Sequence, residues 1–253
     1  MAHFDSDGVT IDYSDDGAGP LVVLVHGYAS NRTINWFNTS WVKTLTGAGY
    51  RVVAIDNRGH GKSEKLYDSE AYQTGTMSGD VVRLLDHLGA ETAVLMGYSM
   101  GARISAFTAL LAPERVRALI LSGLASNIVD GVEGGPEIAA AMEADSVADV
   151  TDRNARAFRV FADQTGSDRK ALAACIRASR QVLSEEQVHE ITAKTLIVAG
   201  DRDDIAGSPE GLAALMPDAE PVTLPGRDHM TAVGEKGHKE AVLAFLQRLP
   251  TQV

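Results

Sequence analysis

Residues 93–102 read AVLMGYSMGA, and this stretch decides how the rest of the chain is interpreted. Its first four residues form a short apolar run typical of a buried strand, and an apolar helical pattern begins at Ile104. The residues between them, GYSMG, fit the motif G-x-S-x-G. The sequence therefore predicts a strand, a very tight turn and a helix, with Ser99 at the apex of the turn.

The two glycines of this motif, Gly97 and Gly101, lack the side chains that would collide where a strand and a helix fold back on each other. The serine between them must adopt a strained backbone conformation, which proteins tolerate mainly where function uses it. Its hydroxyl would stand beside a helix N-terminus, which offers N–H groups to an oxyanion. The motif alone arises by chance in about one of seven chains of this length, so its interpretation depends on the remaining sequence.

Length and charge exclude several classes of protein. The chain has 253 residues, enough for one large α/β domain or two small ones. Its net charge of −11 argues against nucleic acid or an anionic membrane surface as the main partner. No apolar run approaches the ~18 residues that span a membrane, and the first residues, MAHFDSDGVT, lack the apolar region of a signal peptide. We therefore expect a cytoplasmic protein without a membrane partner, of undetermined oligomeric state.

The residue patterns support neither a metal nor a cofactor. The single cysteine, Cys175, excludes an intramolecular disulfide and a multi-cysteine zinc site, and we expect a buried thiol. The histidines are scattered without metal-ligand spacing. No G-x-G-x-x-G motif or phosphate-binding loop occurs. The turn-rich segment DNRGHGKS, residues 56–63, is expected to be a structural loop whose charges hold neighbouring turns together.

Short apolar runs of strand length alternate with helical patterns along most of the chain, which predicts an α/β protein with a mainly parallel sheet and helices on both faces. Between residues 126 and 191 only helical patterns occur, so we predict a core formed by residues 1–125 and 192–253 and a helical insertion over 126–191. The predicted strands span residues 8–15, 21–25, 51–55, 93–96, 116–121, 195–199 and 219–224. Besides the helix after the tight turn, the predicted helices span residues 32–48, 72–88, 136–145, 152–164, 168–182, 184–191, 208–216 and 236–249.

A serine hydroxyl is a weak nucleophile at neutral pH, and it needs a base together with a group that orients the base. His229 is the best-placed base, because it lies in a polar loop between the last predicted strand and the last predicted helix. Loops at the carboxyl ends of parallel strands gather around one crevice, and Ser99 also lies on such a loop. The orienting acid should follow another strand, where the sequence offers three candidates: Asp201, Asp203 and Asp204.

Negative charge develops on the substrate carbonyl oxygen as a serine attacks it, and two backbone N–H groups should meet that oxygen. One should come from Met100, the residue after the serine. The other should come from the loop after the strand 21–25, where Gly27 allows a close approach and Tyr28 would supply its N–H. We expect the neighbouring His26 to pack beneath this loop as a structural residue.

Taken together, these motifs resemble the α/β-hydrolase superfamily over nearly the whole chain. The matching pieces occur in the family's order: His26-Gly27 after a buried strand, D-x-R-G-x-G-x-S at 56–63, the serine motif, Gly200-Asp201-Arg202-Asp203, and G-x-x-H ending at His229. The resemblance implies an eight-stranded, mainly parallel sheet with a helical cap, and the triad order serine, acid, histidine. The family pattern G-x-x-D assigns the acid role to Asp203, with Asp201 as the second choice.

The resemblance also implies an activity, that of a carboxylesterase-like serine hydrolase without cofactor or metal. Ser99 attacks a carboxylic ester, lactone or thioester, His229 transfers the proton, and Asp203 orients the imidazole. The N–H groups of Tyr28 and Met100 bind the oxyanion, and the cap roofs a pocket for a small to medium, partly apolar small molecule. The apolar cap residues are Phe158, Phe161, Leu172 and Ile176.

The family contains other activities, and details of the sequence bear on them. The serine at the apex of the tight turn disfavours the dehalogenase and epoxide-hydrolase branches of the family, which carry aspartate at this position. The alternatives are a perhydrolase or haloperoxidase, a carbon–carbon bond hydrolase, a hydroxynitrile lyase, and a low-turnover ligand receptor. Two loops depart from the common pattern: residues 28–31 lack the proline or further glycines of many relatives, and residues 205–208 lack the proline that often follows the aspartate.

Overall fold

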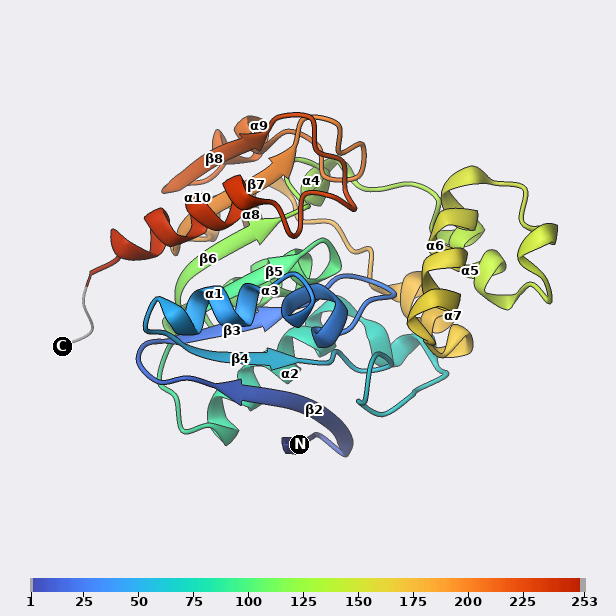
Figure 1. Ribbon diagram of the computed structural model, residues 1–253, viewed down its shortest axis with the longest axis horizontal. Helices are drawn as coiled ribbons and strands as arrows, with labels where there is room; N and C mark the ends of the chain where they lie inside the picture. The colour runs from blue at the N-terminus through green and yellow to red at the C-terminus, as the bar shows by residue number, and fades with distance from the viewer. Residues whose placement is uncertain (1, 251–253) are drawn as a thin grey trace.

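A computed structural model describes residues 2–250 of the chain, and a single twisted sheet runs through its centre (Figure 1). The strand order is β1-β2-β4-β3-β5-β6-β7-β8. The first two pairs, β1 with β2 and β2 with β4, are antiparallel, and the other pairs are parallel. The strands span Ala2–Ser6 (β1), Val9–Asp16 (β2), Leu21–Val25 (β3), Arg51–Ile55 (β4), Ala93–Tyr98 (β5), Val116–Ser122 (β6), Lys194–Gly200 (β7) and Ala219–Leu224 (β8). The prediction of a mainly parallel, eight-stranded α/β sheet is therefore confirmed.

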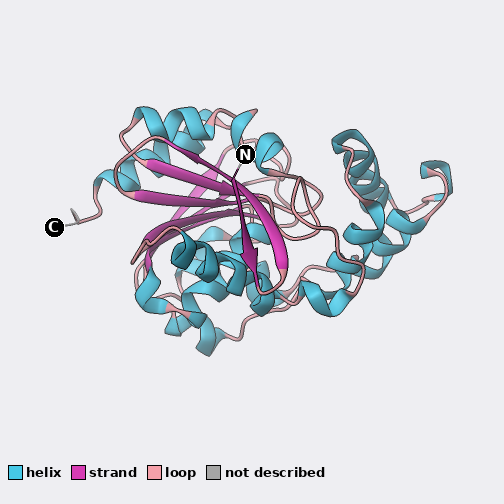
Figure 2. Ribbon diagram, turned by 90° about the horizontal axis from the view of Figure 1, so that it is seen from below, coloured by secondary structure: helices cyan, strands magenta, loops and turns pink. Residues whose placement is uncertain are grey.

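Helices cover both faces of the sheet (Figure 2). The α-helices span Trp41–Gly47 (α1), Thr74–His87 (α2), Met100–Leu111 (α3), Asn127–Asp130 (α4), Gly135–Glu143 (α5), Arg153–Thr165 (α6), Arg169–Ala178 (α7), Glu185–Glu190 (α8), Pro209–Ala213 (α9) and Lys236–Gln247 (α10). Successive side chains of a strand point to opposite faces, so Val22 of β3 packs in the cluster with Phe245 of α10, whereas Val23 packs with Leu84 of α2. Burial on both faces explains why the central strands are continuous apolar runs.

Most predicted elements occur in the structure, and two predictions were wrong. β1 was not predicted, because its exposed residues His3 and Asp5 flank the buried Phe4 and make the segment resemble a polar terminus. The predicted helix 32–48 is divided into a π-helical turn, Thr33–Phe37, and the shorter α1. Ser40 directly precedes α1, and its φ of 65° lies in the left-handed region, which a continuous helix does not allow.

Between β6 and β7, the regular secondary structure consists of helices only, among them α4 to α8. Helices α5, α6 and α7 pack on one another and lie beyond the carboxyl ends of the parallel strands, at one end of the molecule (Figure 1). They therefore stand over the edge of the sheet where the strands' carboxyl-terminal loops gather. We call these three helices the inserted helices.

The segment 56–63 is a buried structural loop, as expected. The guanidinium of Arg58 donates from Nε and Nη2 to the carboxylate of Asp80, at 2.7 and 2.6 Å. The carboxylate of Asp56 accepts from Nη1 of Arg32 and from the backbone N–H of Lys62, both at 2.9 Å. These paired charges hold the loop after β4 against α2 and against the loop that follows β3, which matches the expectation that its charges connect neighbouring turns.

Three histidines are fully buried and uncharged at neutral pH. Burial lowers the pKa of His26 and of His238 to about 4 and that of His60 to about 3. Two of these rings have polar partners at Nε2: that of His26 accepts from the N–H of Asn57 at 3.0 Å, and that of His238 lies 2.9 Å from Oγ of Ser122. His26 thus packs beneath its loop, as expected, and does not act as a base.

Lowering the pH from about 6.5 to about 4 should reduce the free energy of unfolding, because these imidazoles take up protons in the unfolded chain near pH ~6.5 but in the folded chain only near their lowered pKa values. The unfolded state therefore binds more protons in this window, and stability is lost as the pH falls. Urea unfolding across the window measures the slope. His238→Gln, which keeps a polar side chain without titrating, should flatten it, and an unchanged slope would contradict this account.

Candidate active site

Ser99 occupies the strained junction between β5 and α3. Its φ of 54° and ψ of −113° are unfavourable for a residue with a side chain. The junction is so tight that a Cβ atom on Gly97 would overlap the carbonyl oxygen of Gly101, and a Cβ atom on Gly101 would overlap that of Val25. The N–H of Ser99 donates to the carbonyl oxygen of Ser122 on the next strand at 2.7 Å. Neighbouring strands therefore hold the strained conformation in place.

His229 reaches Ser99 from the loop after β8. Its Nε2 lies 3.0 Å from Oγ of Ser99, a distance that allows the proton of the hydroxyl to pass to the ring. The hydroxyl of Tyr98 donates to the carbonyl oxygen of His229 at 2.5 Å, and the two rings lie 5.5 Å apart. Burial, followed by the charge of Asp203, raises the pKa of Tyr98 well above its ordinary value, so Tyr98 stays a donor. Tyr98 thus positions the His229 loop, a role that its place in the serine motif does not signal.

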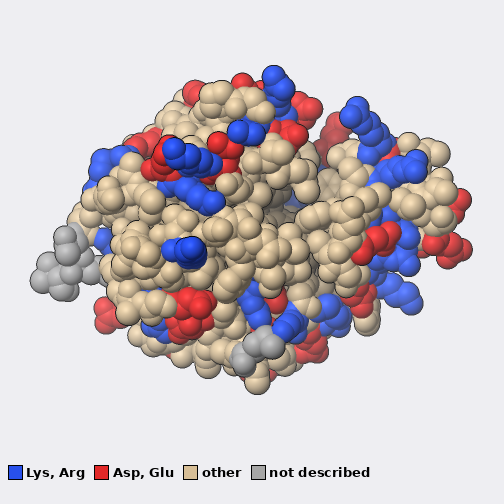
Figure 3. Space-filling model, in the orientation of Figure 1, with Lys and Arg blue, Asp and Glu red and all other residues tan. Residues whose placement is uncertain are grey.

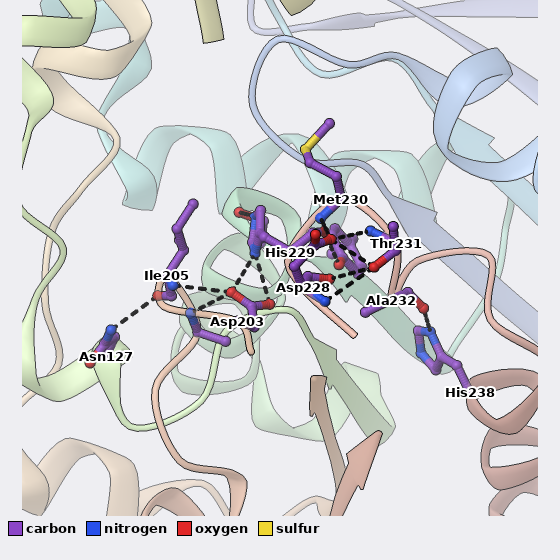
Figure 4. A network of polar contacts seen from close by, with 12 residues as sticks. Asn127, Asp203, Ile205, Asp228, His229, Met230, Thr231, Ala232 and His238 are labelled. Atoms are coloured by element: carbon purple, nitrogen blue, oxygen red, sulfur yellow. Dashed lines mark hydrogen bonds and ion pairs between the residues drawn. The ribbon is translucent and has the colours of Figure 1, made fainter. Parts of the chain in front are cut away.

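Asp203 is the carboxylate that meets the histidine (Figure 4). Nδ1 of His229 lies 3.0 and 2.9 Å from the two carboxylate oxygens. The carboxylate is fully buried, and its Oδ1 also accepts the N–H groups of Ile205 and Ala206 at 3.1 and 3.0 Å. These two N–H groups hold the carboxylate in place beside the imidazole. A buried anion next to Nδ1 fixes the ring with Nδ1 protonated, which leaves Nε2 to accept the serine proton.

One competing acid has another partner. Asp201 accepts the backbone N–H of Gly226 at 2.6 Å and so ties the loop after β7 to the loop that carries His229. Asp204, the third candidate, is exposed, and within residues 2–250 it makes no contact with the imidazole, whose Nδ1 meets Asp203. The structure therefore brings Ser99, His229 and Asp203 together and places Asp201 in the support of their loops.

Two backbone N–H groups border the serine. Met100 is the first residue of α3, whose N–H has no acceptor within the helix. The loop that contains Tyr28 lies close to the end of β5. A Cβ atom on Gly27 would be only 3.2 Å from the carbonyl oxygen of Tyr98, so the absence of a side chain on Gly27 allows this approach. Within residues 2–250, neither the N–H of Tyr28 nor that of Met100 has a hydrogen-bond acceptor. Both groups are therefore free to bind an anionic oxygen next to the serine.

Asn35 orients the loop that contains Tyr28. Its Oδ1 accepts the N–H of Gly27 at 3.2 Å, and the residue is buried. This contact holds the peptide that precedes Tyr28, so it constrains the direction of the Tyr28 N–H. The sequence analysis did not identify Asn35, because it lies in a segment predicted as a continuous helix and no motif marks it.

A cavity of about 250 Å³ opens at the serine. Its lining is largely apolar and includes Ile34, Phe158, Phe161 and Val233 beside Ser99 and His229. A second hollow of about 500 Å³ continues outward along α6 and past Met230. Figure 3 shows the surface hollowed where the inserted helices meet the rest of the molecule. Of the other apolar residues singled out in the sequence, Leu172 is buried in the hydrophobic core and Ile176 lines a neighbouring recess.

The other chemical groups considered in the sequence do not form a second site. Cys175 is buried, its Sγ lies 3.7 Å from Sδ of Met100, and burial raises its pKa to about 12, so it is an unreactive thiol. Within residues 2–250, no cluster of three or more histidine, cysteine or acidic side chains is arranged to hold a metal ion. No helix in the same range is long and apolar enough to cross a membrane.

Comparison with known sequences finds a match between residues 20–133 and the family model for the alpha/beta hydrolase fold. Epoxide hydrolase B of Mycobacterium tuberculosis is 41% identical over 130 residues, which cover 49% of this chain and 35% of that protein. Bifunctional epoxide hydrolase 2 of Sus scrofa is 35% identical over 113 residues, which cover 44% of this chain and 20% of that protein. The similarity thus spans about a third or less of these relatives.

Comparison with solved structures extends the likeness to almost the whole chain. A hydrolase from Pseudomonas aeruginosa PA01 is 26% identical and superimposes with a TM-score of 0.79 over 97% of both chains. The enol-lactonase from Burkholderia xenovorans LB400 is 22% identical, with a TM-score of 0.81 over 98% of this chain and 100% of that one, and shows a shared fold. The sheet, the helical layers and the family match agree. The chain has the alpha/beta hydrolase fold, and its residues 20–133 match the family model for that fold.

Proposed function

We propose that the protein is a serine hydrolase that cleaves a carboxylic ester, lactone or thioester through an acyl-enzyme formed on Ser99. The observation that carries this proposal is the continuous chain of contacts from Ser99 to His229, 3.0 Å, and from His229 to Asp203, 2.9 Å. At one end of this series of contacts, the hydroxyl of Ser99 borders an apolar cavity. A nucleophile, a base and a buried acid in this order are the groups that acyl transfer requires.

In the first half of the reaction, Oγ of Ser99 attacks the substrate carbonyl carbon while its proton passes to Nε2 of His229. The carboxylate of Asp203 stabilises the resulting imidazolium, and the N–H groups of Tyr28 and Met100 stabilise the negative charge on the carbonyl oxygen. His229 then donates its proton to the leaving oxygen or sulfur. The bond to the leaving group breaks, and the acyl group stays on Ser99.

In the second half, water replaces the leaving group. His229 takes a proton from the water as its oxygen attacks the acyl carbon, and the same N–H groups bind the second oxyanion. Collapse of this intermediate returns the proton from His229 to Oγ of Ser99 and releases the carboxylic acid. The enzyme ends in its starting state, and the net reaction consumes one water for each ester cleaved.

We further propose that residues 126–191 act as a cap over a core of residues 1–125 and 192–253. Support comes from α6, whose Phe158 and Phe161 line the cavity opposite the loop residues that carry the serine and the histidine. A volume of about 250 Å³ and a largely apolar lining favour a small to medium substrate with an apolar part.

The names of the sequence relatives raise epoxide hydrolysis as a second reaction, but the chemistry of a serine argues against it here. If a hydroxyl opened an epoxide, the product would be an alkyl ether on Ser99. An ether has no carbonyl carbon for water to attack, so the enzyme would stop after one event. A carboxylate nucleophile instead forms an ester that water can cleave, and this chain has no carboxylate at the elbow.

Ser99→Ala should lower the hydrolysis of p-nitrophenyl acetate by about three orders of magnitude or more, because it removes the atom that carries the acyl group. Steady-state release of p-nitrophenol measures the effect. Ser105→Ala is the matched control, since Ser105 lies on the same helix and its hydroxyl donates to the carbonyl oxygen of Gly101. Substantial activity in Ser99→Ala would refute the proposal.

Asp203→Asn should lower kcat by about two to four orders of magnitude, because a neutral amide neither stabilises the imidazolium nor fixes its tautomer. Asp201→Asn should cost less than about tenfold, since Asp201 contacts a backbone N–H and not the imidazole. Comparison of the two variants on the same ester tests the assignment of the acid. Equal losses would contradict it.

A further inference from the structure

A small recess of about 40 Å³ adjoins Ser99 on the side of α3 and contains two arginine side chains. Arg103 and Arg180 line it together with Tyr28 and Met100, the residues whose N–H groups border the serine. The recess shares Tyr28, Ser99 and Phe158 with the larger apolar cavity, so the two hollows meet at the nucleophile. A substrate attached to Ser99 can therefore place one part in each of them.

Arg103 is a buried cation without an anion. It is 3% exposed, and within residues 2–250 the only hydrogen bond of its side chain runs from Nη1 to the carbonyl oxygen of Gln181. Its Nε and Nη2 have no acceptor in that range, and no carboxylate there forms an ion pair with it. Burying a charge without a counter-charge is unfavourable unless another group binds it.

The other buried arginines of the described chain show the contrast. Each of them has a carboxylate within 3.0 Å: the pairs are Arg32 with Asp56, Arg58 with Asp80, and Arg159 with Asp163. The fold thus supplies an acid wherever it buries an arginine, except at Arg103, the one that lies beside the serine.

Arg180 adds a second positive charge to the same recess. Its Nη1 donates to the carbonyl oxygens of Val132 and Glu133, and no carboxylate within residues 2–250 forms an ion pair with it. Burial lowers the pKa of both guanidinium groups. The pKa of Arg103 falls to about 10, and the nearby charge of Arg180 contributes to this decrease. Both side chains stay cationic at neutral pH, in a protein whose net charge is −11.

We propose that this recess binds a carboxylate on the acyl part of the substrate, so that the substrate is an ester, lactone or thioester of a short dicarboxylic acid. This inference rests on the function proposed above. Nε and Nη2 of one guanidinium form a fork that matches the two oxygens of a carboxylate. The carbonyl oxygen of the acyl part must lie against the N–H groups of Tyr28 and Met100. Because both residues line the recess, we assign the acyl part of the substrate to the recess.

The helix geometry sets the length of the acyl chain. Arg103 lies one turn after Ser99 on the same face of α3, and its N–H donates to the carbonyl oxygen of Ser99 at 3.1 Å. Four residues of helix advance by about 6 Å, so the two residues lie close together, and the recess of about 40 Å³ between them favours a short acyl chain of two or three methylene groups. A succinyl or glutaryl group therefore fits, with its leaving group in the larger apolar cavity.

The test compares two ethyl esters that differ at the end of the acyl chain, monoethyl glutarate and ethyl pentanoate, by measuring ethanol release. The wild-type protein should cleave the charged ester with the higher kcat/KM. Arg103→Gln should lower the ratio of the two kcat/KM values by about 10- to 100-fold, the range for hydrogen bonds to a charged group. Arg180→Gln should lower it as well, and it carries the test if Arg103→Gln does not fold.

The matched control is Arg177→Gln, which removes one positive charge from α7. Arg177 pairs with Glu143 at 2.7 Å and does not line the recess, so the ratio should stay within about twofold of the wild-type value. If ethyl pentanoate is cleaved through Ser99 but the ratio does not respond to Arg103→Gln or Arg180→Gln, the inference is wrong and the proposed function stands.

If the wild-type protein cleaves neither ester, the proposed function fails for these substrates, and binding decides the inference separately. Calorimetric titration of Ser99→Ala with glutarate and with pentanoate provides that measurement. Preferential binding of glutarate that is lost on introducing Arg103→Gln would support an anion site. Equal or undetectable binding of both acids would overturn it.

Discussion

The whole site depends on the contact between the end of β5 and the first turn of α3. The backbones approach so closely that only hydrogen atoms fit on Gly97 and Gly101, and the residue between them is forced to a φ of 54°. The hydrogen bond from the N–H of Ser99 to Ser122 on the neighbouring strand helps to hold this strained conformation. The same contact places the hydroxyl at the start of a helix, where unpaired N–H groups favour negative charge.

The rest of the molecule supports what that junction presents. Parallel strands on both sides of β5 direct their carboxyl-terminal loops to the same edge, so the loops with Tyr28, Asp203 and His229 meet there although they are distant in sequence. Loop-to-loop contacts then fix the geometry: Tyr98 holds the backbone of His229, and Asp201 holds the start of the same loop. The buried charges near β4 are paired, whereas Arg103, which forms no ion pair within residues 2–250, lies beside Ser99.

The central sheet was predictable because burial on both faces requires continuous apolar runs, and several strands have the predicted bounds. β1 was missed because its outward residues are charged or polar. A continuous helix over 32–48 was predicted wrongly, because no residue pattern signals the left-handed conformation of Ser40. The choice of Asp203 needed the family pattern, since three acids crowd one loop. Tyr98, Asn35 and Arg103 could not be identified from sequence, because their roles lie in tertiary partners, or in the lack of one.

The proposed reaction passes through an acyl group on Ser99. Rapid quenching of the enzyme during turnover of an activated ester, followed by peptide mass mapping, measures this directly. The account predicts that one acyl group accumulates on the peptide containing Ser99 and disappears as the substrate is consumed. Sustained ester hydrolysis with no acyl group on Ser99, or with the acyl group on another residue, would contradict it.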